Sequence, residues 1–156
     1  MTAPATKSAV FFAIAPGTVA GLLPYVITRW DIEPAPAAAR IAGALLTAAA
    51  VAVLIHAFAR FVKEGLGTPA PVAPTEHLVI GGLYRHIRNP MYVAVVACVV
   101  GQAGVFGEPA LLLYAAALLT IFVAFVRLYE EPTLQQRYGA DYDAYRQAVP
   151  GWWPRP

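Results

Sequence analysis

Two short segments of the sequence carry side chains that could do chemistry. One holds the adjacent carboxylates Glu130 and Glu131, and the other holds Tyr84 and Tyr92 with arginines between them. Carboxylates and the faces of tyrosine rings stabilise a cation such as a sulfonium, and arginine binds a carboxylate. The two segments could therefore hold a cofactor that carries both charges. The alternative is that the glutamates form an exposed interfacial pair balanced by Arg127.

Other catalytic constellations are missing from the sequence. Ser8 is the only serine and opens an apolar stretch, which excludes the serine nucleophile of a hydrolase. Cys98 is the only cysteine and the histidines lack metal-ligand spacing, so no metal site is expected. The sequence has no G-x-G-x-x-G motif, so no Rossmann-type nucleotide-binding domain is expected. His56 lies within an apolar stretch, where it is either functional or, as we favour, a hydrogen-bonding group between helices.

The apolar bulk of the chain indicates a membrane protein. Of its 156 residues, 59% are hydrophobic and 13% are charged; ordinary soluble domains have roughly 45 to 50% and 25%. A water-soluble domain of this length would expose large apolar patches, and a bilayer removes that difficulty. The formal net charge of +2, with no basic stripe, excludes nucleic acid as a partner.

Charged residues divide the apolar sequence into four predicted transmembrane helices, at 8–28, 41–59, about 91–105 and about 110–126. The last two form a predicted hairpin over 91–126, because a segment with glycine, proline and Glu108 interrupts that apolar run. Four residues predict a kinked or broken first helix: Pro16, Gly17, Gly21 and Pro24. A cleaved signal peptide is the competing interpretation of the first 30 residues.

Basic residues favour one orientation of these four helices. Arg29 and Arg40 lie on one side of the membrane. The other side holds nine basic residues: Lys7, Arg60, Lys63, Arg85, Arg88, Arg127, Arg137, Arg146 and Arg155. The positive-inside rule then predicts that both termini are cytoplasmic, in what we expect to be the inner membrane. Both polar segments therefore meet at the cytoplasmic surface.

These polar segments complete a single predicted membrane domain over 1–156. The connection at 60–90 contains too many apolar residues for a disordered linker, so we expect an ordered loop. In the tail at 127–156, Pro132 suits the first turn of a new helix. Residues at three- or four-residue spacing predict that one face of that interfacial helix is apolar and aromatic: Leu134, Tyr138, Tyr142, Tyr145 and Val149.

The order of motifs in these segments resembles the isoprenylcysteine carboxyl methyltransferase and phospholipid methyltransferase superfamily. The resemblance covers Glu76 to Pro150, about half of the chain. Its motifs are Leu78-Val-Ile-Gly-Gly-Leu-Tyr84, Arg88-Asn-Pro-Met-Tyr92, Glu130-Glu-Pro-Thr-Leu134, Tyr138-Gly139, Tyr142, Tyr145 and Val149-Pro150. The first two predicted helices add only hydrophobicity to the match.

The resemblance implies an all-α integral membrane enzyme that transfers a methyl group from S-adenosylmethionine to a lipophilic acceptor arriving from the bilayer. It assigns cofactor binding to Glu76, His77, Leu78, Val79, Tyr84, Arg88, Asn89, Pro90, Met91, Tyr92 and Glu130. Asn89 stands where the family most often has histidine, while an Arg-His pair occurs at Arg85 and His86. The position of the family's substrate-side arginine aligns with Val126, so Arg127 is its neighbouring substitute.

Several acceptors and rival functions stay open at this point. An isoprenylcysteine carboxylate or a small thiol, as the thiolate, would need no general base. A phospholipid amine would need one, and Glu131 and His86 are the candidates. The rivals are a non-enzymatic four-helix scaffold or transporter subunit, which predicts polar residues inside the bundle, and the four-span glutathione-dependent enzymes, whose arginine-rich membrane helices are absent here.

Overall fold

The computed structural model describes residues 10, 14–65 and 77–154, and all regular structure in them is helical. The first helix, Ile14–Thr28, contains the π-helical turn η1 (Thr18–Leu22) and ends with α2 (Leu23–Thr28). The remaining elements are α3 (Ala37–Gly65), the 3-10 turn η2 (Gly82–Arg85), α4 (Pro90–Phe106), α5 (Ala110–Phe125), the π-helical turn η3 (Val126–Glu130), α6 (Glu131–Tyr138) and α7 (Ala140–Ala148). This confirms the all-α prediction.

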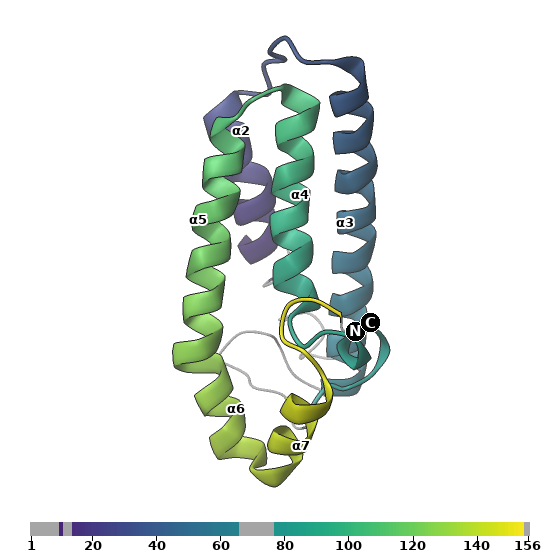
Figure 1. Ribbon diagram of the computed structural model, residues 1–156, viewed down its shortest axis with the longest axis vertical. Coiled ribbons are helices and arrows are strands. Elements are labelled where there is room, and N and C mark those ends of the chain that lie inside the picture. The colour runs from purple at the N-terminus through teal and green to yellow at the C-terminus, as the bar shows by residue number, and fades with distance from the viewer. Residues whose placement is uncertain (1–9, 11–13, 66–76, 155–156) are drawn as a thin grey trace.

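The long helices run side by side, and the short polar elements gather at one end of them (Figure 1). Ala37–Arg60 and Ala110–Tyr138 are long and apolar enough to cross a membrane, whereas Ile14–Thr28 and Pro90–Phe106 are apolar but shorter. The bundle also exposes large apolar side chains that suit contact with lipid, such as Leu45 at 67%, Leu113 at 77% and Leu128 at 80%. The number of membrane crossings therefore stays a prediction.

Small residues let α3 and α4 pack closely. A Cβ atom added to Gly101 would collide with Thr47 Oγ1 and lie 2.7 Å from the Gly43 carbonyl oxygen. One added to Gly104 would lie 2.8 Å from the Ala39 carbonyl oxygen. Contacts between small residues are the usual means by which membrane helices approach each other, because lipid provides little hydrophobic drive for association.

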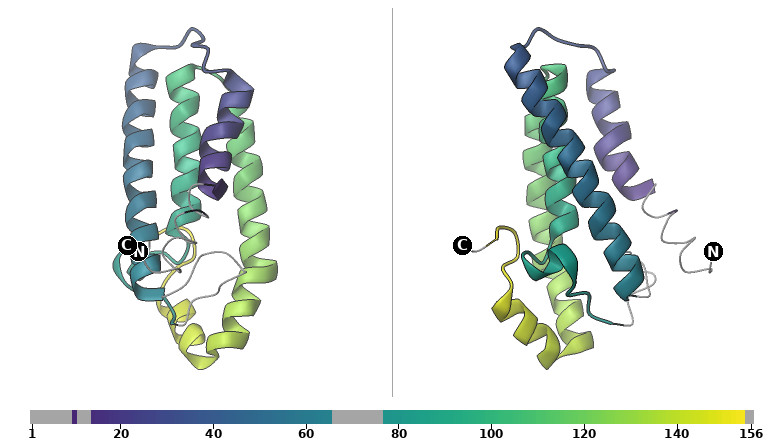
Figure 2. Two further views of the ribbon diagram at one scale, coloured as in Figure 1. Left: turned by 180° about the vertical axis from the view of Figure 1, so that it is seen from behind. Right: turned by 90° about the vertical axis from the view of Figure 1, so that its right-hand side faces the viewer.

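The first helix is irregular, as its prolines and glycines predict. Pro24 has no N–H group, and the π-helical turn before it leaves carbonyl groups without their usual helical partners. Gln102 of α4 donates a hydrogen bond to the Ala20 carbonyl at 2.7 Å, and Tyr114 of α5 donates one to the Val19 carbonyl at 2.8 Å. The helix therefore packs on α4 and α5 at the position of its own irregularity (Figure 2).

The predicted hairpin turn lies between α4 and α5. Gly107 has a φ of +70°, which a glycine adopts without strain. Close by, the Glu33 N–H group donates to the Phe106 carbonyl at 2.9 Å, and Arg40 donates to the Val105 carbonyl at 3.2 Å. The Arg29 to Arg40 connection and this hairpin therefore share one end of the bundle, opposite the polar segments, as expected.

Pro132 lies in the first turn of α6, as predicted, but α6 continues α5 and is not a separate helix. The N–H group of Glu131 donates to the Val126 carbonyl across η3, so α5 continues through a π-helical turn into α6 without a break. Chain reversal occurs instead at Gly139, whose φ of 52° and ψ of −123° strongly favour glycine. The predicted aromatic face is consequently divided between α6 and α7.

Candidate functional site

The loop before α4 is folded against the end of α3. Val79 and Tyr84 are buried together with Ala57, which is fully enclosed. Gly82 has a φ of +58°, and a Cβ atom there would lie 3.3 Å from His56 Nε2. Apolar packing and a close glycine contact thus hold η2 on α3. Of the loop predicted at 60–90, residues 60–65 belong to α3 instead, and residues 66–76 lie outside the described residues.

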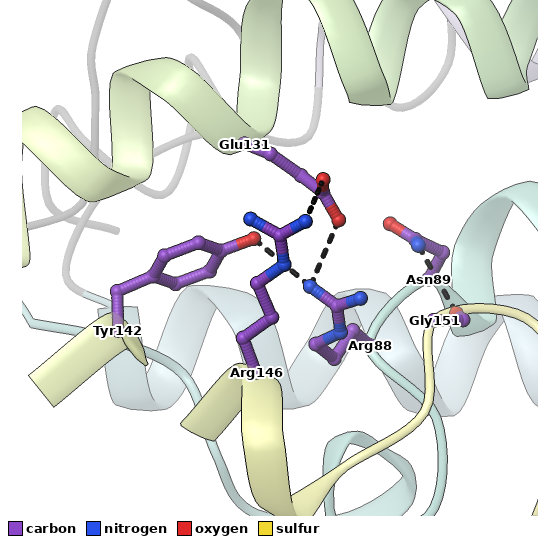
Figure 3. Close-up of polar contacts among 6 residues, drawn as sticks. All are labelled: Arg88, Asn89, Glu131, Tyr142, Arg146 and Gly151. Atoms are coloured by element: carbon purple, nitrogen blue, oxygen red, sulfur yellow. Dashed lines mark hydrogen bonds and ion pairs between the residues drawn. The ribbon is translucent and has the colours of Figure 1, made fainter. Parts of the chain in front are cut away.

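The end of the tail lies across the start of α4. The backbone N–H groups of Arg88 and Asn89 donate to the carbonyls of Pro150 and Gly151 at 2.9 and 3.1 Å. Asn89 Nδ2 also donates to the Gly151 carbonyl, at 3.0 Å (Figure 3). Segments about 60 positions apart in the sequence are therefore joined through main-chain groups, and Asn89, which is 7% exposed, holds them together.

A cluster of charges sits beneath this junction. Arg88 Nη1 donates to Glu131 Oε1 at 2.9 Å and to the Tyr142 hydroxyl at 3.1 Å, and Arg146 Nη2 lies 3.5 Å from Glu131 Oε2 (Figure 3). The side chains of Arg88 and Glu131 are each 14% exposed. Both oxygens of the Glu131 carboxylate thus face cations, which makes this residue the link between α6, α7 and the start of α4.

Two tyrosines of α7 complete the attachment of the tail. Tyr145 donates a hydrogen bond from its hydroxyl to the Tyr84 carbonyl at 2.7 Å. Burial raises the pKa of the Tyr145 phenol well above its usual value. Burial also raises the pKa of the Tyr142 phenol, although the Arg88 guanidinium opposes the shift. Both groups are therefore neutral hydrogen-bonding groups at physiological pH.

Glu130 points to a different place from its neighbour Glu131. Tyr92 donates a hydrogen bond from its hydroxyl to Glu130 Oε2 at 2.9 Å, and the Tyr92 ring packs against Phe122 with centroids 4.8 Å apart. Successive residues of a helix are rotated by about 100°, so two adjacent glutamates can serve two separate sites. Glu131 belongs to the tail junction, whereas Glu130 faces a cavity.

This cavity, of about 160 Å³, lies where the polar loop meets the membrane helices. Its polar side is formed by Tyr84, Arg88, Asn89, Tyr92 and Glu130, and the apolar residues Pro90 and Met91 of the same segment line the cavity beside them. Its apolar side is lined by Ala15, Pro16, Val19, Leu54, Val95 and Phe122. The Nε atom of Arg88 is buried and has no hydrogen-bond partner among the described residues, so a donor remains for a ligand. The arrangement can hold a molecule with a cationic centre, an anionic group and apolar parts.

The structure brings most of the predicted cofactor residues together, since all of those on the polar side of the cavity belong to that set. Val79 lies behind Tyr84 in the loop core, Leu78 is partly buried next to it, and His77 is exposed. Glu76 lies outside the described residues. The remaining predicted residues do not line the cavity: Arg127 and His86 are exposed, and Glu131 is held by two arginines.

Other lining residues were missed by the sequence analysis. The apolar side of the cavity comes from helices that carry no motif, so only their packing identifies Ala15, Val19 or Leu54. Tyr142 was also missed as a partner of Arg88, and Arg146 as a partner of Glu131, although their spacing of four residues in one helix places them on a common face. Among the residues that the structure describes, no group of side chains could bind a metal ion.

Comparison with known proteins identifies the family. No curated protein and no solved structure matches the chain significantly. A family model described as phospholipid methyltransferase matches residues 38–141, which include α3, the loop, α4, α5 and α6. The match covers most of the chain and includes all of the polar lining of the cavity. The chain therefore belongs to the phospholipid methyltransferase family, within the superfamily of membrane methyltransferases that also contains the isoprenylcysteine carboxyl methyltransferases.

Proposed function

We propose that this membrane methyltransferase transfers a methyl group from S-adenosylmethionine to a lipophilic acceptor, with the cavity as its active site. One observation carries the proposal: a carboxylate, a tyrosine hydroxyl and an arginine from distant parts of the chain line the same cavity, at the end of a bundle of apolar helices. We infer a single membrane domain with this end at the cytoplasmic face of the inner membrane, because most basic residues belong to it.

The side chains of the cavity suit both charges of this cofactor. The Glu130 carboxylate and the Tyr92 ring would stabilise a sulfonium. Arg88 would bind the carboxylate of the amino-acid part, since its Nη1 atom is already held by Glu131, whereas its buried Nε atom has no partner in the part of the chain that the structure describes. When bound, S-adenosylmethionine supplies an electrophilic methyl group on sulfur.

The residues of the chain contribute mainly by positioning. Tyr92 holds Glu130 through a 2.9 Å hydrogen bond, Glu131 holds Arg88, and Asn89 attaches the tail over the site. Methyl transfer requires the acceptor in line with the breaking bond, so restricting both reactants in a site that excludes water provides much of the acceleration.

Two classes of acceptor are compatible with these residues, each for one reason. The matching family model favours a phospholipid amine. The scarcity of free bases favours an acceptor that is already nucleophilic, such as an isoprenylcysteine carboxylate or a small thiolate: Glu131 is engaged by arginines, His86 is exposed, and Glu130 is the remaining carboxylate among the described lining residues. An amine acceptor would therefore depend on Glu130 as its base.

Calorimetry on the purified protein in detergent tests the cofactor. We expect S-adenosylmethionine and its demethylated product to bind in the micromolar to low millimolar range. Glu130→Gln should weaken binding of the sulfonium form, because the cation loses its carboxylate. Asp141→Asn removes an exposed carboxylate of α7 and is the matched control, expected to bind as the wild type does. Absence of binding by the wild-type protein would overturn the proposal.

A labelled-methyl assay then identifies the acceptor. Total membrane lipid and farnesylcysteine analogues are offered separately, and the product is identified by mass. Labelling of an amine headgroup would select the phospholipid amine, and labelling of the farnesylcysteine carboxylate would select the isoprenylcysteine reaction. If cofactor binds but neither preparation is labelled, the proposed acceptor class is wrong.

A further inference from the structure

The first helix lies outside the residues that match the family model, yet it forms part of the cavity. The match begins at residue 38, whereas Ile14–Thr28 contributes Ala15, Pro16 and Val19 to the lining. The polar lining is supplied entirely by residues within the match. Two parts of the chain thus build two sides of one cavity.

The two sides differ in chemistry. All the charged and hydroxyl-bearing lining residues are on the loop, the start of α4 and the end of η3. The first helix adds only apolar, compact side chains, which face Leu54 of α3, Val95 of α4 and Phe122 of α5. The polar side accounts for the charged parts of the cofactor, and the apolar side is left for hydrocarbon.

The first helix is held in a defined register beside the cavity. The carbonyls of Val19 and Ala20 accept hydrogen bonds from Tyr114 and Gln102, so the cavity-lining residue Val19 is fixed through its own backbone. Hydrogen bonds between helices help to hold an apolar helix against its neighbours in a membrane protein. The first helix therefore has a defined position where it lines the cavity.

The same helix also presents a surface suited to lipid. Ile14 and Leu22 are 64% and 55% exposed, although their neighbours Ala15 and Val19 line the cavity. An acceptor dissolved in the membrane would thus meet the first helix next to the site. The hydrocarbon nearest to its nucleophilic group would then lie against Ala15 and Val19.

We propose that the first helix is the acceptor side of the active site, and that Ala15 and Val19 determine how bulky the hydrocarbon beside the acceptor's nucleophile can be. The inference rests on the proposed function and deepens it. It assigns acceptor selection to residues outside the family match and cofactor binding to residues largely within it.

Kinetics on enlarged and reduced side chains tests this assignment. The acceptor probes are farnesyl- and geranyl-cysteine derivatives and, for an amine acceptor, dioleoyl and dihexanoyl phosphatidylethanolamine. The pair used is the one whose members accept the labelled methyl group. In Ala15→Phe the KM for the bulkier acceptor of that pair should rise by about tenfold or more, a typical response to crowding in an apolar pocket. The affinity for the demethylated cofactor should stay within about twofold, since the substitution leaves Arg88 and Glu130 unchanged.

Two further variants keep the test decisive. Val19→Ala enlarges the wall and should raise kcat/KM for the bulkier acceptor relative to the smaller one, a gain that a folding defect cannot produce. Leu22→Phe changes an exposed position of the same helix and should alter neither the KM for the acceptor nor kcat/KM.

The outcomes separate this inference from the proposed function. A wild-type protein that binds no cofactor and labels no acceptor refutes the proposed function itself. A wild-type protein that is active, with acceptor selectivity unchanged in both Ala15→Phe and Val19→Ala, refutes only the role of the first helix. Equal losses of acceptor and cofactor affinity in Ala15→Phe would place the helix on the cofactor side and also refute the inference.

Discussion

Replacing Glu131 with alanine should damage both the stability of the protein and its binding of the cofactor. The carboxylate joins Arg88, at the start of α4, to Arg146 of α7. Removing it leaves the Arg88 guanidinium charged, mostly buried and without an anion. We therefore expect the tail to loosen and Arg88 to lose the position in which it lines the cavity.

The burial of each partner determines the size of the effect. Arg88 and Glu131 are both 14% exposed and 2.9 Å apart, and breaking a buried pair by removing one partner costs about 3–5 kcal/mol. Their partial exposure puts the expected loss for Glu131→Ala near the lower figure, about 3 kcal/mol. Arg146 is 54% exposed and 3.5 Å from the carboxylate, so Arg146→Ala should cost less than about 1 kcal/mol.

Equilibrium unfolding in mixed detergent micelles, followed by circular dichroism, measures these differences. The double variant Arg88→Met/Glu131→Leu provides the decisive control. Because it removes both charges and keeps apolar volume, it should recover most of the lost stability, while calorimetry should still detect weakened binding of S-adenosylmethionine. If Glu131→Ala loses no more stability than Arg146→Ala, the view of Glu131 as a buried link is wrong. If Glu131→Ala binds cofactor as the wild type does, the proposal that Glu131 positions Arg88 for cofactor binding is wrong.

Three other predictions concern packing and the tail. Gly101→Leu should lower the thermal unfolding temperature in detergent, because even a Cβ atom there would meet Thr47 of α3; unchanged stability would contradict the close α3–α4 contact. Tyr145→Phe should cost about 1 kcal/mol in detergent unfolding, since the Tyr84 carbonyl loses its donor; a neutral effect would show that this bond does not hold the tail. Because burial raises the pKa of Tyr142 and Tyr145, the folded protein favours the neutral phenols; their contribution is complete below an unfolded-state pKa of about 10 and falls as the pH rises beyond it. The unfolding midpoint should therefore decrease above pH 10, and less in Tyr145→Phe than in the wild type.

Local rules predicted most of the fold but failed in the tail. Charge positions located the α4–α5 hairpin, and the prolines and glycines of the first helix predicted its irregularity, because these effects depend on neighbouring residues alone. Pro132 lies in the first turn of α6, as the local rule predicts. However, α6 continues α5 through the π-helical turn η3, and the chain reverses only at Gly139. A continuous helix past a proline depends on how the preceding turn packs, which spacing does not reveal.

The motifs located the polar side of the candidate site more completely than its apolar side. Tyr84, Tyr92 and Glu130 were singled out because their residue types suit a cation, and they meet at the cavity. The residues on the apolar side are ordinary members of membrane helices. Nothing in their type separates Val19, which lines the cavity, from Leu22, which faces outward.

The sequence by itself determined that this chain is an apolar bundle of helices with its chemistry in two polar segments, because composition and charge spacing limit what a bilayer accepts. Only the tertiary structure decided the division of labour within those segments. Glu130 faces the cavity and Glu131 the arginines, since adjacent residues of a helix point in directions about 100° apart and the packing of the whole bundle sets where each direction leads. The contribution of the first helix to the cavity is likewise a long-range contact, fixed by Gln102 and Tyr114 far along the chain.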